Sequence, residues 1–349
     1  MPRGSTSPQS NLAPDLSLVQ LEPLKEPPSS HCKKECTMPE TAHPNYVGLD
    51  ISKARLDYTI DEKRTAAADN DANGHKQLIQ GLKKQPHARV VCEATGGYER
   101  LVVAKMLEAG IEVCVVQPGR ARSYAYAEGL VAKTDPIDAQ MLRRYGQAVK
   151  LRLATPTDPA VATLRELIDR RRGLVDRLVE VTNQLALAGK TLARWVEREQ
   201  RFLNKELKAV EAEIAKHIGN DPTLRLKSER LQQMTGVGPI LAGTLLAYVP
   251  ELGTLPDPTI SALLGVAPHP RDSGTSSRPR HVRGGRGAVR HVLYMAALAA
   301  VRSNRILGQF YQRLLAAGKP PKVCLVAVMR KMLTVLNQML AKPELVLAD

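Results

Sequence analysis

The sequence predicts a polar leader, an α/β domain, a long helical segment and a mainly α-helical C-terminal domain. Short apolar runs alternate with helical patterns between residues 45 and 150, which is typical of a sheet covered by helices. From 151 to 225 apolar residues recur at helical spacing, and after 226 a small-residue turn opens further apolar helices. Residues 1–44 are rich in Pro, Ser and charged residues without an apolar period, so we expect this leader to be disordered.

The elements expected in the α/β domain follow one another in this order: strands 46–51, 55–60 and 63–69, helix 73–84, strand 88–93, helix 99–109, strand 111–116, and helices from about 119 and 136. Three strands followed by alternating helices and strands is the element order of a ribonuclease-H-like fold. We therefore expect that fold for the first domain.

Four acidic residues stand at the ends of these elements. Asp50 and Glu93 each end an apolar run, so both carboxylates are expected at the C-terminal ends of strands. Asp135 and Asp138 lie three residues apart around Pro136, which suits the first turn of a helix, so they share one face. One such residue alone is most often a turn or helix-cap residue. The four together predict a two-metal site for phosphodiester cleavage, because Mg²⁺ (or Mn²⁺) prefers oxygen ligands and paired ions stabilise both reacting oxygens.

The helical segment carries an apolar stripe from Leu164 to Ile214, with Gly173 and Gly189 inside it. A stripe of this length predicts a helical hairpin or a coiled coil. Two alternatives remain open: the segment packs within the monomer and exposes a charged face, or it is an arm for dimerisation.

The run Gly236-Val237-Gly238-Pro239 opens an apolar helix. A Gly-X-Gly turn lets backbone N–H groups approach a phosphate at a helix N-terminus, as in helix-hairpin-helix modules. Gly236 and Gly238 are therefore candidate nucleic-acid-binding residues. The alternative is a tight turn between packed helices.

The C-terminal part of the chain is strongly basic. Residues 259–349 contain 14 Lys or Arg against 3 Asp or Glu, a net of +11 out of +15 for the whole chain. This charge indicates a polyanionic partner, and since aromatic residues are only 3% of the chain, phosphate contacts must dominate over base stacking. The alternative is a merely nonspecific basic loop. The candidate phosphate-binding arginines are Arg271, Arg278, Arg280, Arg283, Arg286 and Arg290.

Other patterns exclude some classes of protein. No apolar run reaches the roughly 18 residues of a spanning helix and the N-terminus lacks a signal-peptide core, so we expect a cytoplasmic protein without a membrane partner. The 5 cysteines are odd in number and scattered, which predicts reduced thiols. His31, Cys32 and Cys36 have metal-like spacing, but no second ligand pair follows them, so we expect no zinc site there.

Five motifs resemble, in order, those of the DEDD-type insertion-sequence transposases, often called the "IS one-ten" family. They are Tyr46 to Lys53, Cys92 to Tyr98, Lys133 to Ala139, Gly236 to Pro239, and Gly265 to Pro268 followed by Asp272-Ser273-Gly274. The resemblance covers residues from about 45 to 340. Two departures are a leader longer than usual and an expanded segment after the serine, which leaves Ser276 and Ser277 as alternative nucleophiles.

The resemblance implies a RuvC-like domain (45–150) with the metal-binding acids Asp50, Glu93, Asp135 and Asp138. It further implies a coiled-coil linker (151–225) and a transposase domain (226–349) with Ser273 as the nucleophile. The implied partners are double-stranded donor and target DNA, a structured bridge RNA encoded by the element, and further copies of the chain in a dimer or tetramer with composite sites. The implied location is the bacterial cytoplasm, in association with the nucleoid.

We therefore expect a DNA transposase, that is, a site-specific recombinase. Serine is a poor nucleophile at neutral pH, and with no histidine base identified near Ser273, metal coordination is its expected means of activation. Two other classes remain open: a RuvC-like endonuclease that uses metal-activated water, and a nucleic-acid-binding protein without catalysis. Trapping a covalent protein–DNA adduct distinguishes the recombinase from the endonuclease, and the presence of all four acids and the serine argues against a protein without catalysis.

Overall fold

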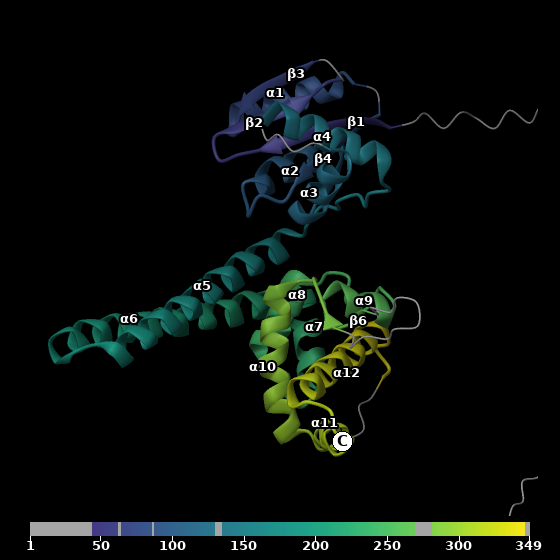
Figure 1. Ribbon diagram of the computed structural model, residues 1–349. Coiled ribbons are helices and arrows are strands. Elements are labelled where there is room, and N and C mark those ends of the chain that lie inside the picture. Colours follow the sequence, from purple (N-terminus) through teal and green to yellow (C-terminus); the bar gives the residue numbers. More distant parts are fainter. Residues whose placement is uncertain (1–43, 62–63, 86, 130–134, 270–280, 346–349) are drawn as a thin grey trace, which may run out of the picture.

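The computed structural model describes residues 44–61, 64–85, 87–129, 135–269 and 281–345. An α/β domain, a projecting pair of long helices and a helical C-terminal domain follow one another along the chain (Figure 1). The predicted order of an α/β region before a mainly helical region is confirmed. The leader and its His31, Cys32 and Cys36 lie outside the described residues.

The α/β domain contains β1 (Asn45–Ile51), β2 (Arg55–Thr59), β3 (Thr65–Asp69), α1 (Ala72–Lys83), β4 (Ala88–Glu93), α2 (Glu99–Glu108), β5 (Glu112–Val116), α3 (Pro118–Ala127) and α4 (Asp135–Ala148). The sheet has the strand order β3-β2-β1-β4-β5. Strands β1, β2 and β3 pair antiparallel, whereas β4 pairs parallel with both β1 and β5. This topology is compatible with the ribonuclease-H-like prediction.

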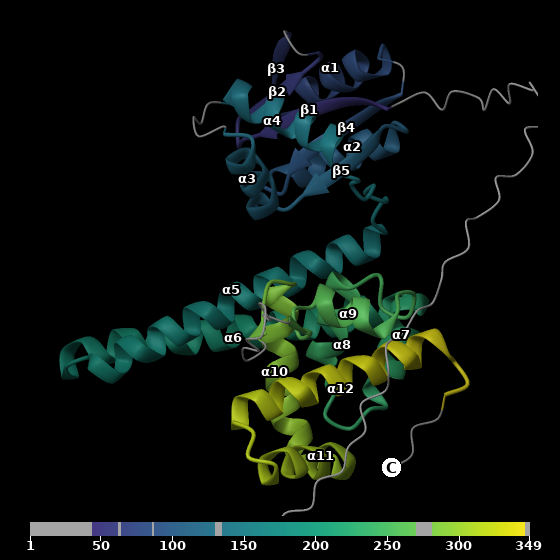
Figure 2. The same cartoon turned by 45° about the vertical axis from the view of Figure 1, so that its right-hand side comes forward.

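Helices cover both faces of this sheet (Figure 2). On one face, Leu78 of α1 and Met106 of α2 pack against Leu49 and Val90. On the other face, Leu142 of α4 packs in a second buried cluster with Val91, Cys114 and residues of α3. The sheet is therefore buried on both sides, which explains why its central strands are apolar runs rather than alternating patterns.

The remaining elements are α5 (Pro159–Leu187), α6 (Lys190–Asn220), α7 (Pro222–Gln232), α8 (Pro239–Tyr248), α9 (Asp257–Leu263), β6 (Pro268–His269), β7 (His281–Val282), α10 (Gly287–Ser303), α11 (Arg305–Ala316) and α12 (Pro321–Ala341). Helices α5 and α6 form the predicted helical hairpin, which projects from the rest of the molecule (Figure 1). Along its outer part the seam buries Leu174, Val181, Val196 and Leu203. Arg177 bridges the two helices by an ion pair with Glu199 at 2.8 Å.

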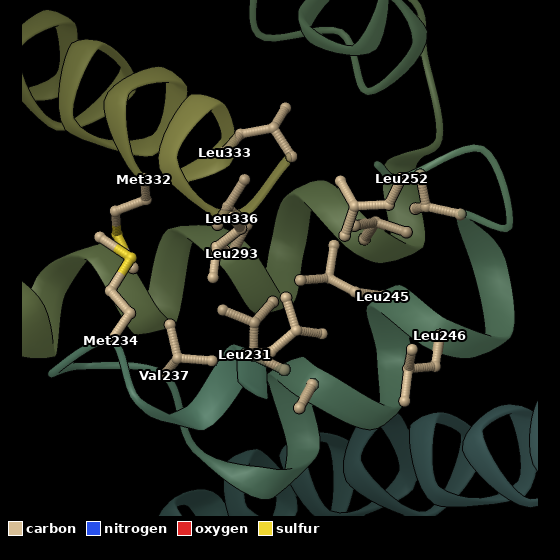
Figure 3. Close-up of a cluster of buried hydrophobic side chains, with 14 of the residues drawn as sticks. Leu231, Met234, Val237, Leu245, Leu246, Leu252, Leu293, Met332, Leu333 and Leu336 are labelled. Atoms are coloured by element: carbon tan, nitrogen blue, oxygen red, sulfur yellow. The ribbon is translucent and has the colours of Figure 1, made fainter. Parts of the chain in front are cut away.

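The base of this hairpin belongs to the C-terminal core. Leu164 and Ile168 of α5 and Ile214 and Ile218 of α6 lie in the same buried cluster as α8, α10 and α12. Figure 3 shows the centre of that cluster, where Leu231, Leu245, Leu293 and Leu336 meet. One apolar stripe thus serves two purposes, because its inner turns anchor the arm and only its outer turns form a two-helix seam.

Helix α12 is long and apolar enough, by length and composition, to cross a membrane. Arg330 and Lys331 interrupt its apolar run, so the sequence alone does not indicate a candidate span here. Half of its apolar window is buried inside the protein, and Val328, Met332 and Leu336 contribute to the C-terminal core. This packing is typical of a core helix.

Three cysteines lie in the described part of the chain: Cys92, Cys114 and Cys324. All three are buried free thiols, as the sequence predicts for them. Burial raises the pKa of the Cys92 and Cys114 thiols, which keeps both protonated and unreactive.

Candidate active site

Asp50 and Glu93 lie at the same end of two neighbouring strands. Strands β1 and β4 run parallel in a register that pairs Asn45 with Ala88 and Leu49 with Cys92. The next positions along this register are Asp50 and Glu93, so the two carboxylates emerge side by side at the C-terminal edge of the sheet. Both residues are partly buried.

Both carboxylates lie on the face that α4 covers. The Gly48 position faces α4 and the Val91 side chain packs in the same cluster as α4, and side chains two residues further along a strand return to the same face. Asp138 belongs to the first turn of α4, and Asp135 is its first residue. The fold therefore brings Asp50, Glu93 and the N-terminal turn of α4 to one edge of the sheet.

Glycine at position 48 permits this close approach of α4. A Cβ atom added at Gly48 would lie 1.8 Å from the Ala139 carbonyl oxygen and 2.7 Å from the Arg143 amide nitrogen. Ala139 directly follows Asp138 in the chain. The contact between Gly48 and α4 thus sets the distance between the acidic end of the helix and the strand that carries Asp50.

We expect Gly48→Ala to displace α4 and to destabilise the domain by about 3 kcal/mol, because backbone atoms cannot yield as a flexible side chain can. This loss corresponds to a fall in melting temperature of roughly 10–20 °C for a domain of this size. Thermal unfolding followed by circular dichroism measures it. The matched control is Gly119→Ala in α3, where an added Cβ meets nothing within 4 Å; an equal loss there would contradict this role of Gly48.

The donor chemistry of this edge suits a hard divalent cation, since every candidate ligand is a carboxylate oxygen. Among the residues whose side chains are described, no three acidic, histidine or cysteine side chains form a complete metal cluster. The Asp135 side chain lies outside that described set. A metal site made by Asp50, Glu93, Asp135 and Asp138 stays a prediction.

Glu99 organises the loop that follows Glu93, and sequence reasoning missed it. Its carboxylate accepts hydrogen bonds from the Thr95 amide (3.2 Å), the Thr95 hydroxyl (3.0 Å) and the Gly97 amide (2.8 Å). Burial favours the protonated form, but these hydrogen bonds hold the pKa of Glu99 below its ordinary value. A carboxylate just after a Thr-Gly-Gly run at the start of a helix is the signal that could have identified it.

Asp57 is a second acidic residue that sequence reasoning missed. It lies opposite Asp50 in the β1–β2 register and is 7% exposed. Its carboxylate accepts a hydrogen bond from Arg55 Nε at 3.0 Å. Asp57 is therefore already paired with a cation beside the candidate site.

In the C-terminal domain, Gly236 and Gly238 play different parts in one turn. Gly236 has φ +99°, and an added Cβ would lie 2.6 Å from the Ala300 Cβ of α10, so this glycine is required by packing between helices. Gly238 is the N-cap of α8, and an added Cβ there would meet nothing within 4 Å. Both line a groove of about 660 Å³ between α5, α8 and α10, whose walls include Arg171, Arg172 and His291.

The predicted nucleophile is carried between two short paired strands. We call the segment Pro268–Val282 the serine hairpin; β6 and β7 pair antiparallel in it, with Pro268 opposite Val282 and His269 opposite His281. Ser273, its alternatives Ser276 and Ser277, and Arg271, Arg278 and Arg280 lie outside the described residues. His269 and His281, which lie opposite each other in the β6–β7 register, are the described histidines at the two ends of this segment.

The described candidate arginines differ in their surroundings. Arg283 is exposed. Arg290 donates a hydrogen bond to the Gly284 carbonyl. Arg286 is partly buried, and its guanidinium donates to the Glu251 carboxylate at 2.7 and 2.8 Å.

Two family models match the chain. A DEDD-type IS110 transposase model matches residues 47–188, and a model described as "Transposase IS116/IS110/IS902 family" matches residues 228–312. The matched segments contain the α/β domain with its acidic residues and the serine hairpin, respectively.

Curated relatives agree with these matches. The "Pilin gene-inverting protein" of Moraxella lacunata is 24% identical over 302 residues, which cover 83% of this chain and 94% of that protein. Its namesake from Moraxella bovis matches over the same length with the same identity. The "Insertion element IS110 uncharacterized 43.6 kDa protein" of Streptomyces coelicolor is 28% identical over 214 residues, 57% of this chain and 50% of that protein.

Proposed function

We propose, on the premise that this chain belongs to the IS110 family of transposases, that it recombines DNA through the carboxylate site of its α/β domain and a serine nucleophile in its C-terminal domain. The chain is a DNA recombination enzyme, and its family implies DNA binding and a dependence on divalent metal. The proposal concerns how its own residues perform that reaction.

The juxtaposition of Asp50 and Glu93 under the first turn of α4 is the observation that carries the proposal. The carboxylates of Asp50, Glu93, Asp135 and Asp138 would hold divalent ions, with Mg²⁺ or Mn²⁺ as the expected species, and a bound ion would supply stabilisation of the charge on the attacking and leaving oxygens. The protein's own part is to hold the carboxylates at one edge of a rigid sheet. The close contact between Gly48 and α4 supports that part.

In the proposed reaction the Ser273 Oγ forms a bond to the scissile phosphorus, and a DNA oxygen leaves as a hydroxyl. The proton lost by Oγ balances the proton gained by the leaving oxygen. His269 and His281 at the foot of the serine hairpin are candidate proton acceptors, beside activation by the metal. The exposed Arg283 neutralises phosphate charge.

A covalent adduct distinguishes this reaction from hydrolysis. Purified protein is incubated with Mg²⁺ and a duplex that carries the ends of its own insertion sequence, then denatured and resolved by electrophoresis. The serine reaction yields DNA that co-migrates with protein, whereas an endonuclease that uses water yields cut DNA without protein attached.

We propose that the chain acts as a homo-oligomer through its helical hairpin. Apolar side chains outside the hairpin seam are exposed along the arm, with Val179 at 57%, Trp195 at 55% and Phe202 at 59%. Leu187 and Leu192 at the tip are exposed at 89% and 57%. Several large apolar side chains exposed on one projecting arm support the proposal that the arm pairs with another chain.

We further propose that a structured bridge RNA from the element guides the enzyme in the cytoplasm, in association with the nucleoid. The resemblance to the family supports this proposal, and the net charge of +11 on residues 259–349 suits a partner rich in phosphate.

We expect the protein, purified from cells that carry its whole element, to retain a discrete RNA transcribed from beside its gene. Its affinity for that RNA should fall steeply with salt, because each phosphate contact releases counterions. Sequencing of the bound RNA and filter binding at several salt concentrations measure the two effects. Random RNA fragments together with recombination in the absence of RNA would contradict guidance.

A further inference from the structure

A partly buried ion pair joins Glu251 to Arg286, which follows the serine hairpin in the chain. Glu251 follows α8 in the chain and is 8% exposed, and Arg286 is the N-cap residue of α10. Arg286 Nη1 lies 2.7 Å from Glu251 Oε2, and Nη2 lies 2.8 Å from Oε1, so the two planar groups meet through two parallel hydrogen bonds. Nη1 also donates to the Tyr248 carbonyl at 2.6 Å. Every one of these contacts is internal to the protein.

Backbone contacts near Arg286 join the chain segment that enters the serine hairpin to the segment that leaves it. The Arg286 amide donates to the Leu263 carbonyl at 3.1 Å. A Cβ added at Gly285 would lie 2.2 Å from the Gly265 nitrogen, so the incoming and outgoing chains cross in direct contact. Gly265 and Gly285 have φ of +70° and +76°, which glycine adopts without strain. Arg286 thus fixes the segment that leaves the hairpin where it crosses the segment that enters it.

Glu251 also contacts the segment that leaves the α/β domain. Arg152, in the linker between α4 and α5, lies with Nη1 3.2 Å from Glu251 Oε1. Two residues later, the Ala154 amide donates to the Val113 carbonyl of β5 at 2.7 Å. The Glu251 carboxylate therefore contacts both Arg286, which follows the serine hairpin, and Arg152, which lies in the segment between α4 and α5.

We propose that Glu251 and Arg286 are positioning residues for strand cleavage, and that Arg286 holds the serine hairpin instead of binding DNA phosphate. The proposal rests on the proposed function, since it concerns how Ser273 is presented to the scissile phosphate. A guanidinium held by a buried carboxylate and a backbone carbonyl is committed to those partners, and releasing it would leave the buried Glu251 carboxylate with the exposed Arg152 as its remaining ion-pair partner among the described residues. Loss of the contact between Arg286 and Glu251 would let the end of the hairpin move and would displace the nucleophile. A shift of about 1 Å can cost roughly 100-fold in rate.

The experiment measures DNA affinity and cleavage separately in the full-length protein. Glu251→Gln, Arg286→Gln and the double variant are compared for the dissociation constant of duplex DNA at several salt concentrations, and for the rate of adduct formation at saturating DNA. We expect the adduct rate to fall about 10-fold or more in each, with the dissociation constant and its salt slope within about twofold of wild type. The double variant should lose little more than either single one, because the two residues act as a unit. Arg286→Lys keeps the charge with one donor group and should fall between wild type and Arg286→Gln.

Two arginines serve as controls. Arg152→Gln removes a 71% exposed partner of the same carboxylate and should leave the adduct rate within about twofold of wild type. Arg283→Gln, at an exposed position three residues before Arg286, should reduce the salt slope of DNA binding by about 0.9.

Two results would overturn the proposal. A reduced salt slope in Arg286→Gln, matching that of Arg283→Gln, would make Arg286 a phosphate contact. An unchanged adduct rate in folded Glu251→Gln, measured well below its melting temperature, would leave the pair a purely structural role. If Glu251→Gln does not fold, Glu251→Asp keeps the charge but shortens the side chain by one methylene, which draws the carboxylate away from Arg286, and this variant must show the same loss of rate. Failure of the proposed function is distinguishable, because then the wild-type protein itself forms no adduct.

Discussion

Asp50→Asn and Glu93→Gln are each expected to reduce strand cleavage at least about 100-fold while leaving DNA affinity near wild type. Each change removes a ligand charge but almost no volume, so the packing of the strand end is preserved and the site loses its hold on the cation. Even the loss of a residue that only supports a metal ligand typically costs 10- to 100-fold. Asp135→Asn and Asp138→Asn should behave alike, because both residues belong to the first turn of α4. Cleavage of labelled duplex in Mg²⁺ and in Mn²⁺ measures the effect, and gel-shift titration measures affinity.

Asp69→Asn is the matched control for these variants. Asp69 ends β3 in the same sheet but is exposed and lies two strands away from Asp50. The same loss of charge there should leave cleavage within about twofold of wild type, as is usual for a surface substitution away from a site. Cleavage at the wild-type rate by two or more of the four site variants would refute the carboxylate site.

The positions of Asp50 and Glu93 could be predicted because each ends an apolar run and the strand boundaries follow directly from those runs. The structure places β1 at Asn45–Ile51 and β4 at Ala88–Glu93, close to the predicted 46–51 and 88–93. Their adjacency could be expected only from the fold class, since the register between parallel strands depends on the helices that connect them. The role of Gly48 is harder still to foresee, because the atom that it avoids belongs to Ala139, far along the chain.

Arg286 illustrates what local composition cannot decide. In the sequence it is one of several arginines in a stretch rich in glycine, which favours a phosphate contact. In the fold its partner is Glu251, which lies 35 residues earlier along the chain. Gly236 also depends on a distant contact, because a Cβ atom at this position would clash with Ala300 of α10 and not with a neighbour in the Gly-X-Gly turn. Both assignments depend on contacts between elements distant in the sequence.

Ser273→Ala is expected to abolish both recombination and the covalent protein–DNA adduct, because only the hydroxyl oxygen can form the bond to phosphorus. DNA affinity should stay near wild type, since a single hydroxyl contributes about 1 kcal/mol of contact at most sites. Gly274 follows it and permits close backbone approach to a phosphate, and the paired strands β6 and β7 hold the two ends of its segment. Adduct formation on denaturing gels and gel-shift titration measure the two properties in parallel.

Ser276→Ala and Ser277→Ala are the controls that fix the register of this segment, since both serines lie within four residues of Ser273 and carry the same reactive group. Each should retain adduct formation within about twofold of wild type, because removing a hydroxyl that only contacts solvent or phosphate costs little. Ser273→Cys adds a sharper test, because it keeps a nucleophile at the same position but one of different size and pKa. A weak adduct joined by a sulfur–phosphorus bond, identified by its different chemical lability, would place the linkage at position 273. An adduct that persists in Ser273→Ala, or peptide mapping that places the DNA on Ser276 or Ser277, would move the nucleophile along the hairpin. It would leave the carboxylate site of the α/β domain untouched, since the two sites are carried by separate parts of the chain.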